Sequence, residues 1–497
     1  MTKRVVLGAL FGALTMLATG CGDECVDQFD CRDKGTAPEG QQWTCNADNK
    51  CELQNLPVEP EPDAGTGADA GTDAGSDAGT DAGTDAGTEV DAGTDAGTET
   101  DAGTDAGMNV GKGGACSATP DCMAGLRCEA NTCQSLLIAV TASGAALSDG
   151  GTGTAALVTP FDVPSPTSLS DAGVASAYPR FGPGGTQVAF VQGDVTAAEG
   201  ELSVRPIPVT DAAATVLTTG GSARIRYMEW EPGNLIAWVR GSTGISTIAG
   251  TGGTVTSITN SGTFPDWAAN GTDFAYSAAT QGILVSTGGA APAVLQGSPT
   301  SAEQPHFNRV TSQLLFLANP ENETVTFGTD VTPVLKLYSL PVTGGGAPEV
   351  LAPKTSDAVA GGTVDSYIAN PNWAPDGSWV AYVRAYYQNV GGAAVLCGSA
   401  SATLCGDRAG NIVFLQRVNT TTGVAEGGPV QLAENATLPS FSPDGRLVAF
   451  IKSGELNVQA IDPATGQASG TAIVHTKGTY TVLTNEGDDH RPRWQPR

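Results

Sequence analysis

Short stretches in which apolar and polar residues alternate, separated by Gly, Pro, Asn and Asp, fill the chain from residue 135 to residue 497. Such alternation is typical of half-buried β-strands, and the stretches are rich in Val, Ile, Phe, Tyr and Thr. An aromatic residue recurs in a fixed setting seven times, and six of the seven copies have Pro two residues before it. The pattern predicts an internally repeated protein made of strands. The aromatic positions are Phe181, Trp230, Trp267, Phe307, Trp373, Phe441 and Trp494.

Each copy predicts a unit of four antiparallel strands. Nine residues after most of these aromatic residues, a second aromatic residue follows two small or aliphatic ones, as at 188–190 and 448–450. Turns such as Pro-Asp-Gly at 375–377 separate the two strands, because Pro presets φ and Gly adopts positive φ. Third and fourth strands follow, as at 201–204 and 215–217. Residues 135–497 give about 52 residues per copy, which is the size of a propeller blade.

The two ends of the repeat region complement each other. Only three residues follow Trp494, so the last copy lacks its second strand. Residues 137–140 have the second-strand pattern without a preceding aromatic copy. A C-terminal strand that completes the first blade would close a ring and remove the exposed strand edges. The sequence therefore predicts an all-β, seven-bladed propeller; a six-bladed ring stays open, because residues 308–311 replace the turn motif in the Phe307 copy.

Two segments, 371–377 (PNWAPDG) and 439–445 (PSFSPDG), resemble the core motif of the TolB-type, WD-repeat-like propeller repeat. Residues 492–496 (PRWQP) resemble the closing segment of that family. The resemblance covers the propeller alone, and it implies a fold more strongly than a function. TolB itself has six blades, so its partner-binding residues are not carried over to this chain.

Residues 1–20 predict an export signal, with Lys3 and Arg4 before an apolar core that is too short to span a membrane. Residues 17–21 (LATGC) resemble a bacterial lipobox, which implies a lipid on Cys21; a plain secretory signal is the alternative. Gly22 follows the cysteine, which resembles outer-membrane sorting. We therefore expect a protein anchored to the outer membrane that is either periplasmic or exposed at the surface.

Eleven cysteines agree with one lipidated residue and five disulfides. One set of four lies in a cysteine-rich module at 21–56, a second set in a module at 111–134, and a pair in the insert after the second strand of the Trp373 copy. The connectivity within each set of four stays open, and zinc is disfavoured by the spacing and the absence of His in either module. The ten cysteines are Cys25, Cys31, Cys45, Cys51, Cys116, Cys122, Cys128, Cys133, Cys397 and Cys405.

The second module resembles the Dickkopf-type N-terminal cysteine-rich motif, and it is either a structural knot or a small binding module. Between the two modules, residues 57–110 contain an Asp-Ala-Gly-Thr repeat from Asp63 to Gly107, with ten Asp and two Glu in the repeat. This composition predicts a disordered, self-repelling tether, and tight calcium binding is disfavoured because no rigid loop is present.

The formal net charge is −28, and residues 135–497 contribute 17 basic and 28 acidic residues, hence −11. Without a basic patch, nucleic acid is excluded as a partner. No Gly-x-Ser-x-Gly motif or metal-binding His pair is present among the three histidines, so we predict neither a catalytic residue, a cofactor nor a metal. We expect His475 to be solvated in an outer strand.

One cluster offers candidate ligand-binding residues at the mouth of the propeller channel. Its charged members directly precede the closing strand, and residues from other copies hold comparable positions; a solvated loop with weak ion pairs is the alternative. The candidates are Asp488, Asp489, His490, Arg491, Tyr178, Tyr227, Glu303 and Gln304.

The function that these features favour is a monomeric, non-enzymatic scaffold that binds an envelope or cell-surface protein, or a glycan. A lyase or hydrolase that acts on a polysaccharide at the channel mouth is the main alternative, and a passive surface lipoprotein is another. Converging carboxylates and a pocket large enough for a sugar would favour the enzyme. A channel packed with apolar side chains or plugged by loops would favour the scaffold.

Overall fold

The computed structural model describes residues 41–45, 50–55, 110–146, 152–171, 173–194, 199–218, 225–230, 232–475, 480–484 and 490–497. The chain divides into two compact units, Met1–Glu99 and Thr100–Arg497. In the first unit, β1 (Gln41–Cys45) pairs with β2 (Cys51–Asn55), and Cys45 lies opposite Cys51 in the register. The predicted signal, the lipidation site Cys21, the residues Cys25 and Cys31, and residues 57–109 of the predicted tether lie outside the described residues.

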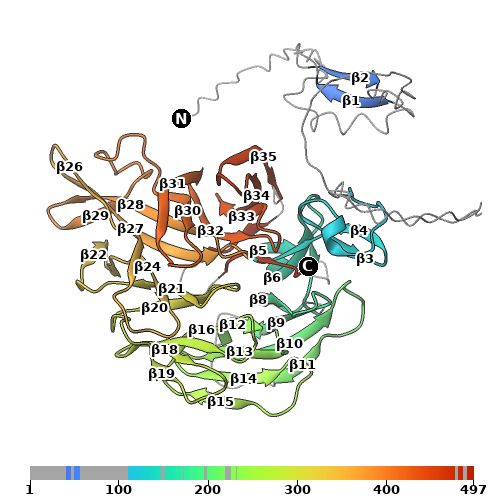
Figure 1. Ribbon diagram of the computed structural model, residues 1–497, viewed down its shortest axis with the longest axis horizontal. Helices are drawn as coiled ribbons and strands as arrows, with labels where there is room; N and C mark the ends of the chain where they lie inside the picture. Colours follow the sequence, from blue (N-terminus) through green and yellow to red (C-terminus); the bar gives the residue numbers. More distant parts are fainter. Residues whose placement is uncertain are drawn as a thin grey trace, which may run out of the picture. The chain divides into compact units, whose positions relative to one another are not determined.

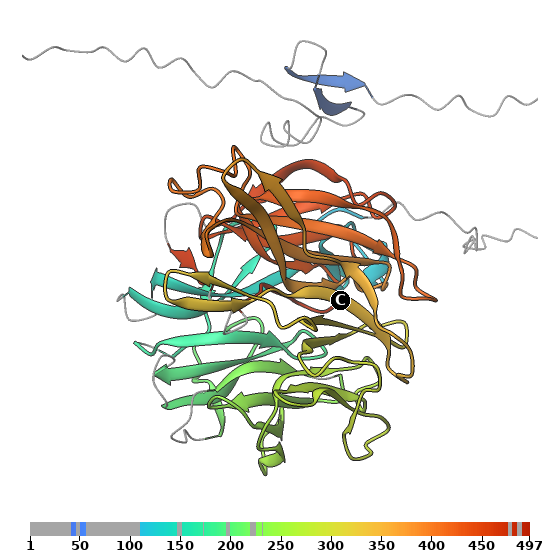
Figure 2. The ribbon, with the colours of Figure 1, turned by 90° about the vertical axis from the view of Figure 1, so that its left-hand side faces the viewer.

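The second unit is an all-β propeller, in which antiparallel sheets follow one another around a ring (Figures 1 and 2). Within the described residues, five of the sheets have four strands each, so the predicted four-strand unit is confirmed. Their strands are β8 (Ser176–Phe181), β9 (Gln187–Asp194), β10 (Glu199–Pro206) and β11 (Thr215–Thr218); β12 (Ile225–Trp230), β13 (Leu235–Arg240), β14 (Ile245–Ala249) and β15 (Thr256–Thr259); β16 (Thr263–Trp267), β17 (Phe274–Ala278), β18 (Gly282–Ser286) and β19 (Ala293–Val294); β20 (Glu303–Phe307), β21 (Gln313–Ala318), β24 (Lys336–Pro341) and β25 (Glu349–Ala352); and β32 (Ala436–Phe441), β33 (Leu447–Lys452), β34 (Glu455–Ile461) and β35 (Ala468–Val474).

The ring closes through a sheet that joins both ends of the repeat region. The second strand β5 (Leu137–Ala146) pairs with β6 (Thr152–Pro160) on one side, and β6 pairs with β7 (Thr167–Ser168). On its other side, β5 pairs with β37 (Arg493–Trp494) and β36 (Thr481–Val482). Trp494 lies opposite Ile138 in the register. The predicted closure by a C-terminal strand is therefore confirmed.

One sheet departs from the four-strand unit because two of its strands continue outward from the ring (Figure 1). We call its outer part, with strand order β23-β22-β29-β28-β27-β26, the accessory sheet. The disulfide between Cys397 and Cys405 follows β29, inside the insert where it was predicted. The strands of the whole sheet are β22 (Thr324–Phe327), β23 (Asp330–Pro333), β26 (Ser356–Val359), β27 (Gly362–Trp373), β28 (Trp379–Val390), β29 (Ala393–Leu396), β30 (Asn411–Val418) and β31 (Ala425–Glu434).

The hydrophobic core lies between consecutive sheets of the ring. Ala189 and Phe190 of the second strand β9 are fully buried, as the small-small-aromatic pattern predicts. Each fully buried large apolar side chain contributes about 2 to 3 kcal/mol to the free energy of folding. The recurring tryptophans also link neighbouring sheets: Trp373 Nε1 donates to the His306 carbonyl at 3.0 Å, and Trp494 Nε1 donates to the Ser440 carbonyl at 3.1 Å.

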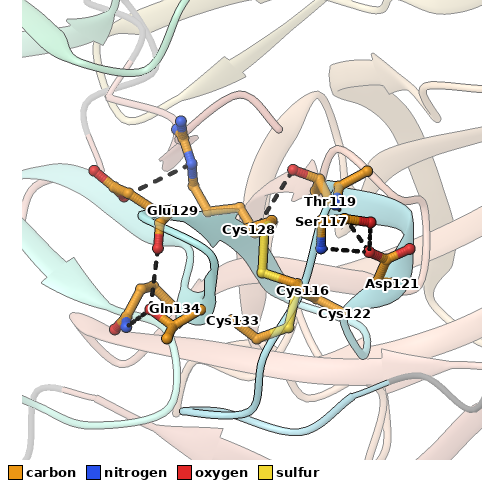
Figure 3. The surroundings of a disulfide bond; sticks show 12 residues. Cys116, Ser117, Thr119, Asp121, Cys122, Cys128, Glu129, Cys133 and Gln134 are labelled. Carbon is orange, nitrogen blue, oxygen red and sulfur yellow. Dashed lines mark hydrogen bonds and ion pairs between the residues drawn. A yellow bond between two sulfur atoms is a disulfide. The ribbon is translucent and has the colours of Figure 1, made fainter. Parts of the chain in front are cut away.

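The second cysteine-rich module contains the 3₁₀ turn η2 (Thr119–Asp121) and the hairpin of β3 (Leu126–Glu129) and β4 (Thr132–Ser135). Disulfides join Cys116 to Cys128 and Cys122 to Cys133, which gives the connectivity that the sequence left open (Figure 3). Asp121 holds the η2 turn, because its carboxylate accepts hydrogen bonds from the backbone N–H groups of Ser117 and Ala118.

This module packs on the propeller beside the closing sheet. The Gly125 N–H donates to the Asp444 carboxylate at 2.9 Å, and Arg497 Nε donates to the Leu126 carbonyl at 3.1 Å. Cys122 and Cys133 share one buried apolar cluster with Trp494 of the closing strand. The contacts favour the structural interpretation of the module over an independent binding module. None of the helices in the part of the chain described here is long and apolar enough to cross a membrane.

Candidate functional site

The innermost strands carry a repeated bulge. In six of them the pairing with the second strand shifts register at two residues, of which the first has positive φ and the second is Pro or Met228. Proline has no N–H to donate to the ladder, so it fits the gap in the pairing. A left-handed conformation is rare for residues other than glycine. The six left-handed residues are Tyr178, Tyr227, Phe264, Gln304, Asn370 and Leu438.

These bulge residues converge in the ring. Tyr227, Phe264, Gln304 and Asn370 line one small pocket together with Arg491, which precedes Pro492 in the closing copy. The pocket has a volume of about 20 Å³. That is the space of about one water molecule. We call this region the channel neck; Pro265, Pro305, Glu229 and His306 complete its lining.

The residue after the bulge is polar in every copy, including Glu229 in the copy with Met228. Some of these side chains bind one another, and Arg491, which precedes Pro492, binds groups of neighbouring copies. Arg493 Nη2 donates to Glu229 Oε1 at 2.5 Å, and Arg180 Nε lies 3.7 Å from the same oxygen. Arg491 Nη1 donates to the Pro371 carbonyl at 3.1 Å, and its Nη2 lies 3.5 Å from His306 Nε2. Charges from several copies are therefore paired with one another across the neck.

Asp266 is a buried carboxylate in the same layer. Its Oδ2 accepts a hydrogen bond from the Phe307 N–H of the next copy at 2.6 Å, and its Oδ1 lies 3.8 Å from Arg309 Nη2. Burial raises the pKa of Asp266 to about 6, and the nearby Glu229 charge acts in the same direction. Asn372 holds the equivalent position in another copy, where its Oδ1 accepts from the Phe441 N–H at 3.3 Å.

The predicted ligand-binding residues fall into three groups. Tyr227, Gln304 and Arg491 meet at the neck. Tyr178 stacks on His490, with ring centroids 5.0 Å apart, and both side chains are buried and not exposed at a rim. Glu303, at the start of β20, does not line the neck pocket, and burial raises the pKa of its carboxyl.

The other two candidates, Asp488 and Asp489, lie outside the described residues. Sequence reasoning missed Glu229 and His306 as residues of the channel neck. Their position directly after the bulge was the available signal, because the side chains before and after a prolyl gap both face the ring interior here.

One expectation about the histidines is wrong. His475 is only 1% exposed, whereas we expected it to be solvated in an outer strand. It follows the end of β35, where its N–H donates to the Leu456 carbonyl at 2.8 Å and its ring meets Phe161 and Asp162. Burial lowers the pKa of His475. Within the described residues, the metal-compatible group of Cys116, Cys122 and Cys133 is engaged in disulfides.

Larger cavities lie away from the neck. A groove of about 600 Å³ separates the second cysteine-rich module from β6 and β7, with Leu137, Val158 and Ile207 among its lining residues. A second cavity, of about 290 Å³, lies beside the accessory sheet. Another cavity, of about 490 Å³, is lined by Leu235, Ile258 and Trp267 among others. Space for a small organic molecule is therefore available at these places and not at the neck.

Comparisons with known proteins found similar folds only among solved structures; no family profile and no curated protein sequence matches the chain. The crystal structure of TolB from Acinetobacter baumannii is 13% identical, with a TM-score of 0.36 over 73% of this chain and 67% of that chain. An oligogalacturonate lyase in complex with manganese is 14% identical, with a TM-score of 0.42 over 71% of this chain and 88% of that chain. A protein from Lactobacillus plantarum is 12% identical, with a TM-score of 0.45 over 72% of this chain and 99% of that chain. Similarity at this level says nothing about activity.

Proposed function

We propose that this protein is a lipid-anchored envelope protein whose seven-bladed propeller binds a partner without catalysis. Cys21 would carry the lipid, and residues 57–110 would separate the head from the outer membrane. Support for seven blades comes from the five four-stranded sheets together with the closing sheet and the sheet of β27, β28, β30 and β31. The partner would be another envelope or cell-surface protein, or a glycan.

The filled channel neck carries the proposal. A sugar ring needs a cavity several times larger than the 20 Å³ available there. The charged groups that line the neck already have partners: Glu229 binds Arg493, and Arg491 donates to the Pro371 carbonyl. A substrate would have to break these pairs, and separating buried charges costs several kcal/mol. The rigid ring instead presents its long inserts outward, where binding residues on repeat scaffolds commonly lie.

The test is affinity capture from crosslinked cells with the full-length lipidated protein as bait. A variant with Cys21→Ser reports how much of the capture depends on the membrane anchor. Recovery of one specific envelope protein or polysaccharide supports the scaffold. Capture that does not exceed the level obtained with an unrelated lipoprotein contradicts it.

A polysaccharide-active enzyme is the second candidate, because Glu229 lines the neck together with His306 and Arg491, and burial raises the pKa of Asp266 to about 6 with the Glu229 charge acting in the same direction. Release of unsaturated or reducing ends from a panel of polysaccharides, abolished by Glu229→Gln, would support it.

Protease treatment of intact cells would locate the propeller. Cleavage without permeabilisation indicates the exterior, and protection indicates the periplasm.

A further inference from the structure

The accessory sheet is the main departure of this chain from its own repeat. The strands β27 and β28 have 12 residues each, whereas β12 and β13 of a regular sheet have 6. Beyond the ring, β29 from this sheet pairs in parallel with β22 from the preceding repeat. Two separate inserts therefore combine into one structure.

The accessory sheet has an aromatic core of its own. Phe327 packs edge-on against Tyr387, with ring centroids 5.5 Å apart at 77°, and Tyr367 lies 6.1 Å from Tyr387. Val325, Val334 and Ala394 are buried in the same cluster. Because the accessory sheet has a packed core, the side chains on it are held in place before a ligand binds.

A polar cavity of about 290 Å³ opens between the two inserts. Its walls combine two carboxylates, an ammonium group, several hydroxyls and one side-chain amide with the apolar faces of two valines. This is a mixture that recognises hydroxyl groups on a compact ligand. The lining residues are Glu323, Thr324, Val325, Val334, Lys354, Thr355, Ser356, Thr363, Asp365, Tyr387 and Asn389.

The carboxylates are held in fixed positions. Ser356 Oγ donates to Asp365 Oδ1 at 2.5 Å, and Thr363 Oγ1 donates to Asp365 Oδ2 at 2.8 Å. The Lys354 ammonium group binds the Glu323 carboxylate. Each carboxylate oxygen can accept two hydrogen bonds, so both oxygens of Asp365 keep acceptor capacity toward the cavity.

Tyr387 supplies the second observation. The residue is only 4% exposed, and it lines the cavity. Burial raises the pKa of Tyr387 to about 12, and the charges of Asp365 and Glu323 act in the same direction. A protonated tyrosine hydroxyl in a cavity wall is suited to a ligand that both donates and accepts hydrogen bonds.

We propose that this cavity binds a neutral sugar residue of a glycan, with hydroxyls donating to Asp365 and Glu323 and with Tyr387 completing the hydrogen bonds. The proposal rests on the binding function proposed above and names one ligand class for it. The two carboxylates against one ammonium group disfavour acidic sugars, because a uronate would bring a third carboxylate into the cavity.

The test is saturation-transfer NMR on the full chain with four probes: glucose, galactose, N-acetylglucosamine and galacturonate. We expect transfer to at least one neutral sugar and little to galacturonate. Asp365→Asn should weaken binding about tenfold, and Tyr387→Phe about fivefold, from the loss of one charged and one neutral hydrogen bond. Asp330→Asn, on the exposed hairpin of β22 and β23, is the matched control and should bind as the wild type does.

Absence of transfer to all three neutral sugars would overturn the proposal, and so would transfer that both pocket variants leave unchanged. A thermal melt of each variant checks that the fold is retained. The proposed function fails separately, because a protein partner captured from cells would still be recovered with Asp365→Asn. Loss of capture with the wild type would remove the function, whatever the sugar result.

Discussion

Replacing Asp266 by Asn should stabilise this protein at neutral pH. The carboxyl group is buried, and its pKa rises from 3.8 to about 6 on folding. Each unit of pKa change corresponds to about 1.36 kcal/mol. Ionisation of Asp266 therefore lowers the free energy of unfolding by about 3 kcal/mol. Asparagine cannot ionise, and its Oδ1 can still accept from the Phe307 N–H, as Asn372 does from Phe441 in another copy.

The sign follows from the direction of the pKa change. Below pH 3.8 the group is neutral in both states and costs nothing, whereas above about pH 6 it is charged in both states and the full cost is present. The attraction to the partly exposed Arg309 lowers the pKa of Asp266 and is therefore already contained in this net shift. The expected gain at about pH 8 is therefore about 3 kcal/mol, with little gain at about pH 4.

Urea unfolding followed by tryptophan fluorescence at these two pH values measures the difference. Asp407→Asn, at an exposed position, is the control and should match the wild type at both. If Asp266→Asn is no more stable than the wild type at about pH 8, the carboxylate is better solvated or better paired than its burial implies. The reasoning from burial would then be refuted.

Three further predictions concern the rest of the head. Gly125→Ala should destabilise the protein by about 2 kcal/mol or more, because the residue has a φ of +75° and a Cβ there would lie 2.6 Å from the Phe161 ring. Thermal unfolding measures the loss, and an unchanged melting temperature would contradict the packing of the cysteine-rich module on the propeller. Folding lowers the pKa of His475 below its unfolded value of 6.5, so the protein should lose stability as the pH falls below 6.5. His475→Gln should reduce this loss in urea unfolding, and a pH dependence identical to that of the wild type would show that His475 is not its source. Replacing both Cys397 and Cys405 by Ser should increase proteolysis within the loop and lower stability by about 2 to 3 kcal/mol at most; cleavage rates equal to those of the wild type would show that the loop is held by other contacts.

The fold follows from the sequence to an unusual degree because its signals are repeated. The aromatic residue with Pro two positions before it marks each innermost strand, and ring closure follows from the missing second strand after Trp494. The small-small-aromatic pattern marks the buried second strands, such as β9. Local patterns sufficed here because each unit repeats the same neighbours.

The channel and the accessory sheet were harder to derive. The proline pattern predicts a repeat, and it also marks the bulge that turns Phe264 and Gln304 inward. Pairing between β22 and β29 joins residues about 70 apart in sequence, as Thr326 with Ala393, and no local pattern predicts such a contact. The burial of His475 was not predicted for a similar reason, since it depends on Phe161 and Asp162 in the turn after β6, which is distant in sequence.

The C-terminal segment 490–497 contacts the channel neck, the closing sheet of the propeller and the second cysteine-rich module. Arg491 lines the channel neck, and Trp494 pairs with the first sheet and closes the ring. Gln495 Nε2 donates to the Gly185 carbonyl at 2.7 Å, and Arg497 donates to the Leu126 carbonyl of the cysteine-rich module. These eight consecutive residues thus complete the channel neck and the ring, and they form part of the surface on which the cysteine-rich module packs. Because Arg493 belongs to this segment, we infer that its ion pair with Glu229 forms only when the segment closes the ring.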